Sequence, residues 1–238
     1  MAEFLGKDRV PPEHIISIYT ANEEIKKELE KIRLGKVNVI LDKVKFFLPN
    51  RTIQLNNKIK LIKGDMFFSN AQTLTISVNT VGVMGKGLAS RTRYQFPDVF
   101  VEYQDACRFK KLRMGKPYLI KREKSLDEVL AYGPSTLANK NSLTWFLLFA
   151  TKYHWKNDSN FAGIEKGLQW LVKNYRKEDI TTSIALPALG CGLGKLSWES
   201  VGPLMCNYLN KMDIESFIYL PMEERPPEKQ LKASFLLR

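Results

Sequence analysis

The chain has 238 residues, of which 37 are Lys or Arg and 25 are Asp or Glu, so its formal net charge is +12 at pH 7. With 44% hydrophobic and 26% charged residues, the composition is typical of a globular protein and excludes a chain that is disordered throughout. The positive excess favours a polyanionic partner, such as nucleic acid, a phosphorylated ligand or an anionic membrane surface.

The sequence pattern of residues 1–58 predicts a small α+β extension. This segment carries no catalytic signature. A possible capping box at residues 20–23 precedes a predicted helix at 24–32, and two β-like runs follow at 37–41 and 44–49. A polar stretch then separates these elements from the rest of the chain. We expect a structural accessory unit, of unknown role, to end at residue 58.

From residue 59 onward, strand-like and helix-like segments alternate, which predicts one layered α/β domain with a mixed sheet. We expect strands at 59–62, 74–79 and 117–120, within 142–149, and at 183–187 and 215–220. We expect helices at 99–111, 162–174 and 199–210. The domain is predicted to span residues 59–221, and residues 222–238 to form a polar C-terminal tail.

Two glycine-rich loops, residues 79–89 and 189–196, each lie between a predicted strand and a helix. Glycine lets a backbone adopt positive φ and approach a ligand closely, and helix N-termini present free N–H groups, so the two loops together can cradle a diphosphate. Tight turns alone would also require glycine. Neither loop has Gly-Lys followed by Ser or Thr, or the full G-x-G-x-x-G spacing, which disfavours kinases, GTPases and plain Rossmann domains.

The few cysteines and histidines indicate neither a disulfide framework nor a metal site. Cys107, Cys191 and Cys206 are far apart, and His14 and His154 stand in no metal-binding pattern. The N-terminus lacks the apolar region of a signal peptide, and no apolar run is long enough to span a bilayer. We therefore expect a cytoplasmic protein without a metal, a cofactor or membrane contact.

Four stretches, residues 63–66, 79–89, 150–155 and 186–198, occur in the order found in macrodomains, the ADP-ribose-binding fold. More narrowly, the chain resembles the DarG antitoxins, which remove ADP-ribose from DNA modified by a DarT toxin. That subfamily has an Asn-Thr-Val-Gly-Val-Met-Gly-Lys-Gly loop, a Thr-Lys-x-His-Trp motif and a Leu-Gly-Cys-Gly-x-Gly-x-Leu-x-Trp loop. The resemblance covers about residues 59–220 and implies a three-layer α/β/α fold, ADP-ribose or ADP-ribosylated DNA as ligand, and a DarT-like toxin as partner.

The resemblance also implies how ADP-ribose is held. Asp65 would accept a hydrogen bond from the adenine amine, with Met66 beside the base, although an Asp after Gly is also a common turn or cap residue. The first loop would surround the distal ribose and one phosphate, and the second loop the diphosphate. Lys86 could add charge there or simply be exposed to solvent. The implied ligand-binding residues are Asp65, Met66, Asn79, Thr80, Val81, Gly82, Val83, Met84, Gly85, Lys86, Gly87, Leu88, Thr151, Leu189, Gly190, Cys191, Gly192, Leu193 and Gly194.

Lys152 falls at the position of the catalytic lysine in DarG-like proteins. It could act as a nucleophile through its neutral amine, or as a cation that stabilises the opening ribose. Related terminal ADP-ribose glycohydrolases pair this lysine with an Asp where this chain has Gly194, which agrees instead with the DarG pattern. His154 would share a face with Lys152 in an extended segment and could act as acid or base, but a histidine beside Trp155 is more often structural.

A basic stretch offers a candidate footprint for DNA phosphates, with a solvated surface as the alternative. Its members are Arg108, Lys110, Lys111, Arg113, Lys116, Lys121, Arg122 and Lys124. We therefore expect a macrodomain hydrolase that releases ADP-ribose from DNA. A non-catalytic ADP-ribose-binding module, and a hydrolase acting on ADP-ribosylated protein or a small ADP-ribose derivative, are the alternatives.

Overall fold

The computed structural model describes residues 14–20, 23–32, 35–42, 45, 49, 51–122, 144–221 and 226–238. The chain divides into two compact units, Met1–Asn50 and Arg51–Arg238. None of the helices in these described ranges is long and apolar enough to cross a membrane.

In the smaller unit, a helix connects two parallel strands. Strand β1 (Ser17–Thr20) pairs with β2 (Asn38–Leu41), and α1 (Glu23–Lys31) lies between them in the chain. The predicted helix and the first predicted β-like run are therefore confirmed. The second run, residues 44–49, falls mostly outside the described residues.

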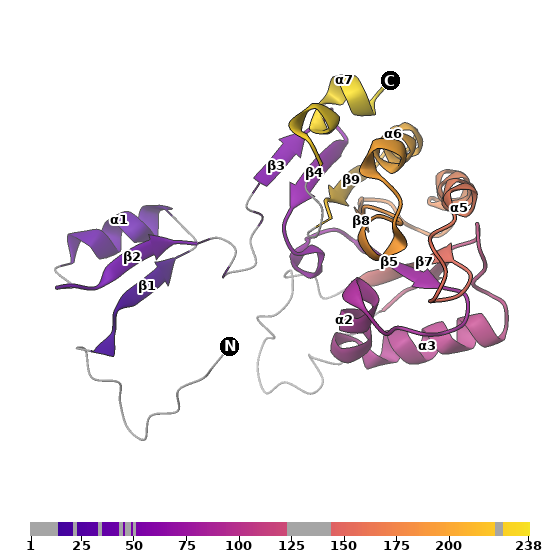
Figure 1. Ribbon diagram of the computed structural model, residues 1–238, viewed down its shortest axis with the longest axis horizontal. Helices are drawn as coiled ribbons and strands as arrows, with labels where there is room; N and C mark the ends of the chain where they lie inside the picture. The colour runs from indigo at the N-terminus through magenta and orange to yellow at the C-terminus, as the bar shows by residue number, and fades with distance from the viewer. Residues whose placement is uncertain are drawn as a thin grey trace. The chain divides into compact units, whose positions relative to one another are not determined.

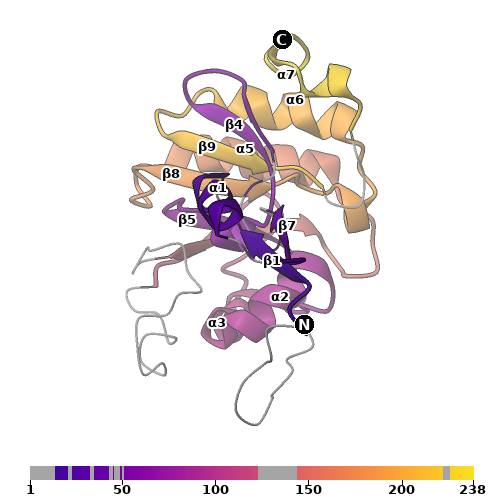
Figure 2. The same cartoon turned by 90° about the vertical axis from the view of Figure 1, so that its left-hand side faces the viewer.

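In the described part of the larger unit, seven strands form one mixed sheet in the order β3-β4-β9-β8-β5-β7-β6. The five inner strands are parallel, and the two edge strands, β3 and β6, are antiparallel to their neighbours. Figure 2 shows β4, β9, β8 and β5 side by side. The strands are β3 (Arg51–Gln54), β4 (Ile59–Lys63), β5 (Thr73–Asn79), β6 (Tyr118–Ile120), β7 (Trp145–Lys152), β8 (Ser183–Pro187) and β9 (Glu215–Tyr219).

Helices cover both faces of this sheet, which makes the three-layer α/β/α arrangement that was predicted (Figure 1). One face carries α2 (Gly87–Gln95) and α3 (Pro97–Arg108), and the other carries α5 (Phe161–Asn174) and α6 (Trp198–Leu209). Shorter helical segments are η2 (Met66–Phe68), η3 (Gly192–Gly194), η4 (Glu228–Leu231) and α7 (Ala233–Leu236).

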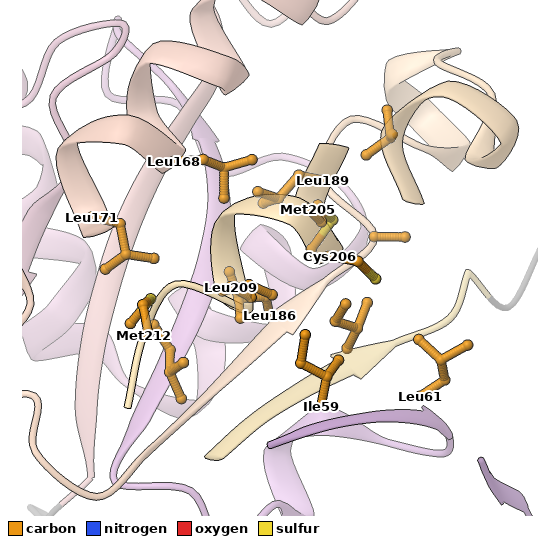
Figure 3. Packing of buried hydrophobic residues seen from close by; sticks show 14 of the residues in the cluster. Ile59, Leu61, Leu168, Leu171, Leu186, Leu189, Met205, Cys206, Leu209 and Met212 are labelled. Carbon is orange, nitrogen blue, oxygen red and sulfur yellow. The ribbon is translucent and has the colours of Figure 1, made fainter. Parts of the chain in front are cut away.

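The inner strands are apolar on both faces because both faces are covered. In β7, Leu147 and Phe149 belong to the core under α5 and α6, whereas Phe146 and Leu148 belong to the core under α2 and α3. Figure 3 shows the first of these cores, where side chains of α5 and α6 meet those of β4 and β8. This two-sided burial explains why the strands were recognisable as apolar runs.

The predicted boundary after residue 58 is wrong, because β3 belongs to the main sheet. Arg51 lies opposite Lys63, and Gln54 opposite Lys60, so that β3 and β4 form a hairpin. β3 was missed because it is a short edge strand in which only Ile53 is partly buried, so it has no apolar run.

The predicted polar tail is also wrong, because its described part packs on the main unit. Leu231 is 5% exposed and Leu236 is 1% exposed, and both belong to the core under α6. The indole Nε1 of Trp198 donates to the Gln230 carbonyl at 3.2 Å. The charged, proline-rich start of this segment obscured the apolar side chains that follow it.

A substitution at Gly167 tests the contact between α5 and β7. A Cβ at this position would lie 2.3 Å from the Phe149 ring, which is fully buried. We expect Gly167→Ala to lower the free energy of unfolding by about 1–2 kcal/mol, because overpacking outweighs the gain in helix propensity. Urea unfolding measures this, with Gly85→Ala as the control, since its Cβ would approach no atom closer than 4.0 Å. A stabilised Gly167→Ala variant would contradict the packing described here.

Candidate active site

A cavity of about 1010 Å³ lies at the carboxyl ends of the parallel strands, within the larger unit. Residues that line it follow or end β4, β5, β7, β8 and β9. This is the edge at which open α/β sheets bind ligands, because loops from several strands converge there.

Asn79, at the end of β5, holds the first glycine loop in place. Its Oδ1 accepts hydrogen bonds from the N–H groups of Val81 at 3.0 Å and Val83 at 3.3 Å, and its Nδ2 donates to the Val83 carbonyl at 2.6 Å. The Tyr103 hydroxyl donates to the Asn79 carbonyl at 2.9 Å, and burial raises the pKa of Tyr103, so this group remains a donor. Internal hydrogen bonds therefore order this loop.

The N-terminus of α2 lies in the cavity wall and is a candidate anion site. Gly87 begins the helix with a φ of +59°, which favours glycine, and no side chain caps the helix at Lys86. The N–H groups of the first turn have no partners within the helix, and Gly87, Leu88 and Ala89 line the cavity. These amides and the helix dipole favour a bound phosphate.

The second glycine loop depends on close packing against Ser159. A Cβ at Gly194 would lie 2.3 Å from the Ser159 Oγ, and one at Gly190 would lie 2.7 Å from the Leu196 side chain. Gly190 also has a φ of +76°. Space for a carboxylate side chain is therefore absent at Gly194, where related glycohydrolases carry an Asp.

A register shift brings Lys152 to the cavity. Val78 of β5 pairs with Ala150 of β7, but the next residue, Asn79, pairs with Lys152, so that β7 has one extra residue at its end. Such bulges redirect side chains next to functional sites. The Lys152 Nζ donates to the Leu193 carbonyl of the second loop at 3.2 Å.

The pKa of Lys152 is lowered from its ordinary value, chiefly by burial. Asp158 raises this pKa and Lys195 lowers it further, and these two residues form an ion pair with each other at 2.9 Å. The lowered pKa increases the fraction of neutral amine, which is the nucleophilic form of a lysine.

Asp65 caps η2 and also forms an ion pair. Its Oδ1 accepts a hydrogen bond from the Phe67 N–H at 3.1 Å, and its Oδ2 lies 2.8 Å from the Arg91 Nη2. The Arg91 guanidinium stacks on the Phe67 ring, 4.6 Å from its centroid. Because each carboxylate oxygen accepts more than one hydrogen bond, these contacts leave capacity for the adenine amine that the resemblance assigns to Asp65.

Most of the predicted ligand-binding residues line the cavity, together with Lys152. They are Asp65, Met66, Asn79, Val83, Gly85, Lys86, Gly87, Leu88, Thr151, Gly190, Cys191, Leu193 and Gly194. Those that do not line it are Thr80, Val81, Gly82, Met84, Leu189 and Gly192. Met84 and Leu189 are buried in the core, so they support the loops rather than the ligand.

Several cavity residues were missed by sequence reasoning. They include Gly64, Ser77, Arg91, Trp155, Lys156, Ser159, Ala188 and Pro221. Ala188 and Pro221 could have been found, because they directly follow predicted strands whose carboxyl ends lie at the site. Arg91 and Ser159 had no such signal, because Arg91 lies on α2 and Ser159 in the loop before α5, where its N–H donates to the Gly194 carbonyl at 3.0 Å.

The structure does not bring His154 to the cavity. β7 ends at Lys152 and the chain then bends, so the predicted extended segment, which would place both side chains on one face, is wrong. The His154 Nδ1 accepts a hydrogen bond from the Lys156 N–H at 3.3 Å, and its ring lies 5.3 Å from that of Trp155. These contacts support the structural alternative for His154.

Two members of the predicted basic stretch, Arg122 and Lys121, are paired with carboxylates. Arg122 is 7% exposed, pairs with Asp98 at 2.6 Å and stacks on Phe96, which makes it a structural residue and corrects its assignment to DNA. Lys121 pairs with Asp179 near the amino end of β7, at the opposite edge of the sheet from Lys152. Lys124 lies outside the described residues. No described member of the stretch lines the cavity.

The three-layer fold, the mixed sheet and the cavity between two glycine loops together define a macrodomain. No family model matches the chain. A solved structure of the macrodomain of Mycobacterium tuberculosis DarG is 30% identical, with a TM-score of 0.59 over 70% of this chain and 99% of that one. The corresponding macrodomain of Thermus aquaticus DarG is also 30% identical, over 68% of this chain and 98% of that one, with a TM-score of 0.57. The chain belongs to the family of DarG macrodomains.

Longer relatives extend the likeness to the whole chain. A "DNA ADP-ribosyl transferase-DNA ADP-ribosyl glycohydrolase fusion protein" of Thermosipho africanus (strain H17ap60334) is 58% identical over 238 residues, which is 100% of this chain and 61% of the relative. The structure described as Thermosipho africanus DarTG in complex with ADP-ribose has a TM-score of 0.82 at 56% identity, over 96% of this chain and 59% of that one. The chain thus spans about three fifths of these relatives.

The close contact between Gly194 and Ser159 predicts that substitutions at these two positions have coupled effects. We expect Gly194→Ala to lower the free energy of unfolding by about 1–3 kcal/mol and to weaken ADP-ribose binding, because the new Cβ displaces the Ser159 hydroxyl or the loop. Ser159→Ala in the same chain removes the 2.3 Å contact and leaves a Cβ to Cβ distance of 3.1 Å, so part of the loss should be recovered. A double-mutant cycle by thermal unfolding and calorimetric titration measures this coupling. Strictly additive effects would contradict it.

Proposed function

We propose that this chain hydrolyses the bond between ADP-ribose and a nucleotide of DNA, and so reverses the modification made by a DarT-like transferase. The observation that carries the proposal is the position of the Lys152 amine, which lies at the cavity between the two glycine loops and has a lowered pKa. Membership of the DarG macrodomain family supports DNA as the substrate.

The cavity suits ADP-ribose because it offers neutral amides for the diphosphate and a carboxylate for the base. The amides are those of the α2 N-terminus and of the loop at Gly190–Gly194, and the carboxylate is Asp65. Amides at a helix N-terminus bind phosphate without a mobile counter-charge. The distal ribose then faces the end of β7, where Lys152 lies.

The chemical step requires an attack on the anomeric carbon of the distal ribose. The neutral Lys152 amine forms a bond to this carbon while the bond to the nucleobase breaks, its electron pair leaves with the base, and the base takes a proton from the lysine nitrogen. Water then displaces the lysine: its hydroxyl group bonds to the anomeric carbon and its remaining proton goes to the lysine nitrogen, which releases free ADP-ribose and restores the amine. Burial of Lys152 favours this role over that of a fixed cation, because burial destabilises the charged form.

Lys152→Ala tests the chemistry. We expect the rate of ADP-ribose release from an ADP-ribosylated single-stranded oligonucleotide to fall by at least about 100-fold, while ADP-ribose affinity changes far less. Lys173→Ala, an exposed lysine at the end of α5, is the matched control and should retain the parent rate. Chromatography of the released ADP-ribose and calorimetric titration are the measurements.

The same assay separates the alternative functions. Release from an ADP-ribosylated protein but not from the oligonucleotide would favour a protein hydrolase. Binding of ADP-ribose without release from either substrate would favour a non-catalytic binding module. Full activity of Lys152→Ala would contradict the catalytic assignment.

Asp158 and Lys195 act on the Lys152 pKa in opposite directions, so removing one charge or the other should shift the pH dependence of activity in opposite directions. A nucleophilic amine becomes active as the pH rises through its pKa. Asp158→Asn removes a charge that raises the Lys152 pKa, so activity should appear at lower pH, and Lys195→Ala removes a charge that lowers it, so activity should appear at higher pH. Single-turnover rates measured against pH test this. A rate that falls as the pH rises would indicate that Lys152 acts as a cation.

A further inference from the structure

We propose that three loops bordering the cavity form a stacking platform for the single-stranded DNA that flanks the modified nucleotide. We define the rim as Val81, Val83, Tyr153, Trp155 and Leu193, which come from the loops after β5, β7 and β8. This inference rests on the proposed function, and it names the part of the protein that recognises the rest of the substrate.

The rim exposes large apolar side chains, two of them aromatic. Tyr153 is 56% exposed, Trp155 51% and Leu193 59%, while Val81 is 47% and Val83 39% exposed. Such groups cost solvation free energy when they remain in water, and their gathering around a cavity marks a binding surface. Three of them, Val83, Trp155 and Leu193, also line the cavity.

Hydrogen bonds join the three loops into one border. The Tyr153 carbonyl accepts hydrogen bonds from the Thr80 N–H at 3.1 Å and from the Thr80 hydroxyl at 2.8 Å. On the other side, the Lys152 Nζ donates to the Leu193 carbonyl at 3.2 Å. The bend at residues 153–155 is therefore attached to the first glycine loop directly, and to the second loop through the preceding residue, Lys152.

The cavity mouth is positively charged. Lys86 and Lys156 line the cavity, and neither of them makes an ion pair within the described ranges. Asp65 is the only acidic residue among the described cavity-lining residues, and it is already paired with Arg91. The Lys156 ammonium lies 5.0 Å from the centre of the Trp155 ring, so one charge and one aromatic face lie together.

Exposed rings beside lysines match single-stranded DNA in particular. Unpaired bases stack on aromatic side chains while lysines neutralise the phosphates between them. In a duplex the faces of the bases are already covered, and an acidic peptide would satisfy the lysines but leave the rings in water. A nucleotide whose attached ADP-ribose fills the cavity also brings its neighbours directly to the rim.

The test compares two substrates that carry the same modified nucleotide, one as an ADP-ribosylated mononucleotide and one within a single-stranded oligonucleotide. We expect the parent to have a higher kcat/KM for the oligonucleotide. Tyr153→Ala and Trp155→Ala should each reduce this preference by about 5- to 100-fold, which corresponds to the loss of one stacked base. This preference is the ratio of kcat/KM for the oligonucleotide to kcat/KM for the mononucleotide. An effect of Trp155 on ADP-ribose itself changes both values and cancels in the ratio, so the ratio reports binding of the flanking strand.

Phe109→Ala is the matched control. Phe109 is also an exposed aromatic residue, at 64%, but it lies between Arg108 and Lys110 of the basic stretch and does not belong to the rim. It should leave the preference unchanged. Equal kcat/KM for both substrates, or a preference lost in Phe109→Ala and kept in both rim variants, would overturn the inference while leaving the proposed function intact. A parent that releases ADP-ribose from neither substrate would overturn both.

Discussion

The register shift between β5 and β7 is the constraint on which the site depends. It places Asn79 opposite Lys152, so that the residue that orders the first glycine loop and the proposed nucleophile are neighbours across two strands. Lys152 reaches the second loop through the Leu193 carbonyl. One irregular strand pair therefore connects both glycine loops.

Positive potential around the cavity comes from two sources, the amides of a helix N-terminus and the side chains of lysines. Neutral amides at the α2 N-terminus suit the diphosphate of the proposed ligand, because the helix dipole supplies partial positive charge there. Lysines without ion pairs in the described ranges surround the mouth instead. Under the proposed function, this division leaves the lysines at the mouth for the DNA that carries the ADP-ribose.

Sequence reasoning succeeded wherever one element carried its own signal. The inner strands are buried on both faces and so appear as apolar runs, as in β5 and β7. The glycine loops were recognisable because their residues occur in a long ordered pattern. Reasoning failed at β3 and at residues 226–238, since an edge strand and a short helix obtain their stability from contacts with distant segments.

The sequence by itself determined the α/β class and the two glycine loops, and it indicated Lys152 as a candidate, because each of these signals lies in contiguous residues. The tertiary structure decided how the charges are used. Arg122 and Lys121 have carboxylate partners distant in sequence, Asp98 and Asp179, whereas Lys156 lies beside an exposed Trp155 at the cavity. A count of lysines and arginines cannot separate these cases, because burial and pairing depend on which segments the fold brings together.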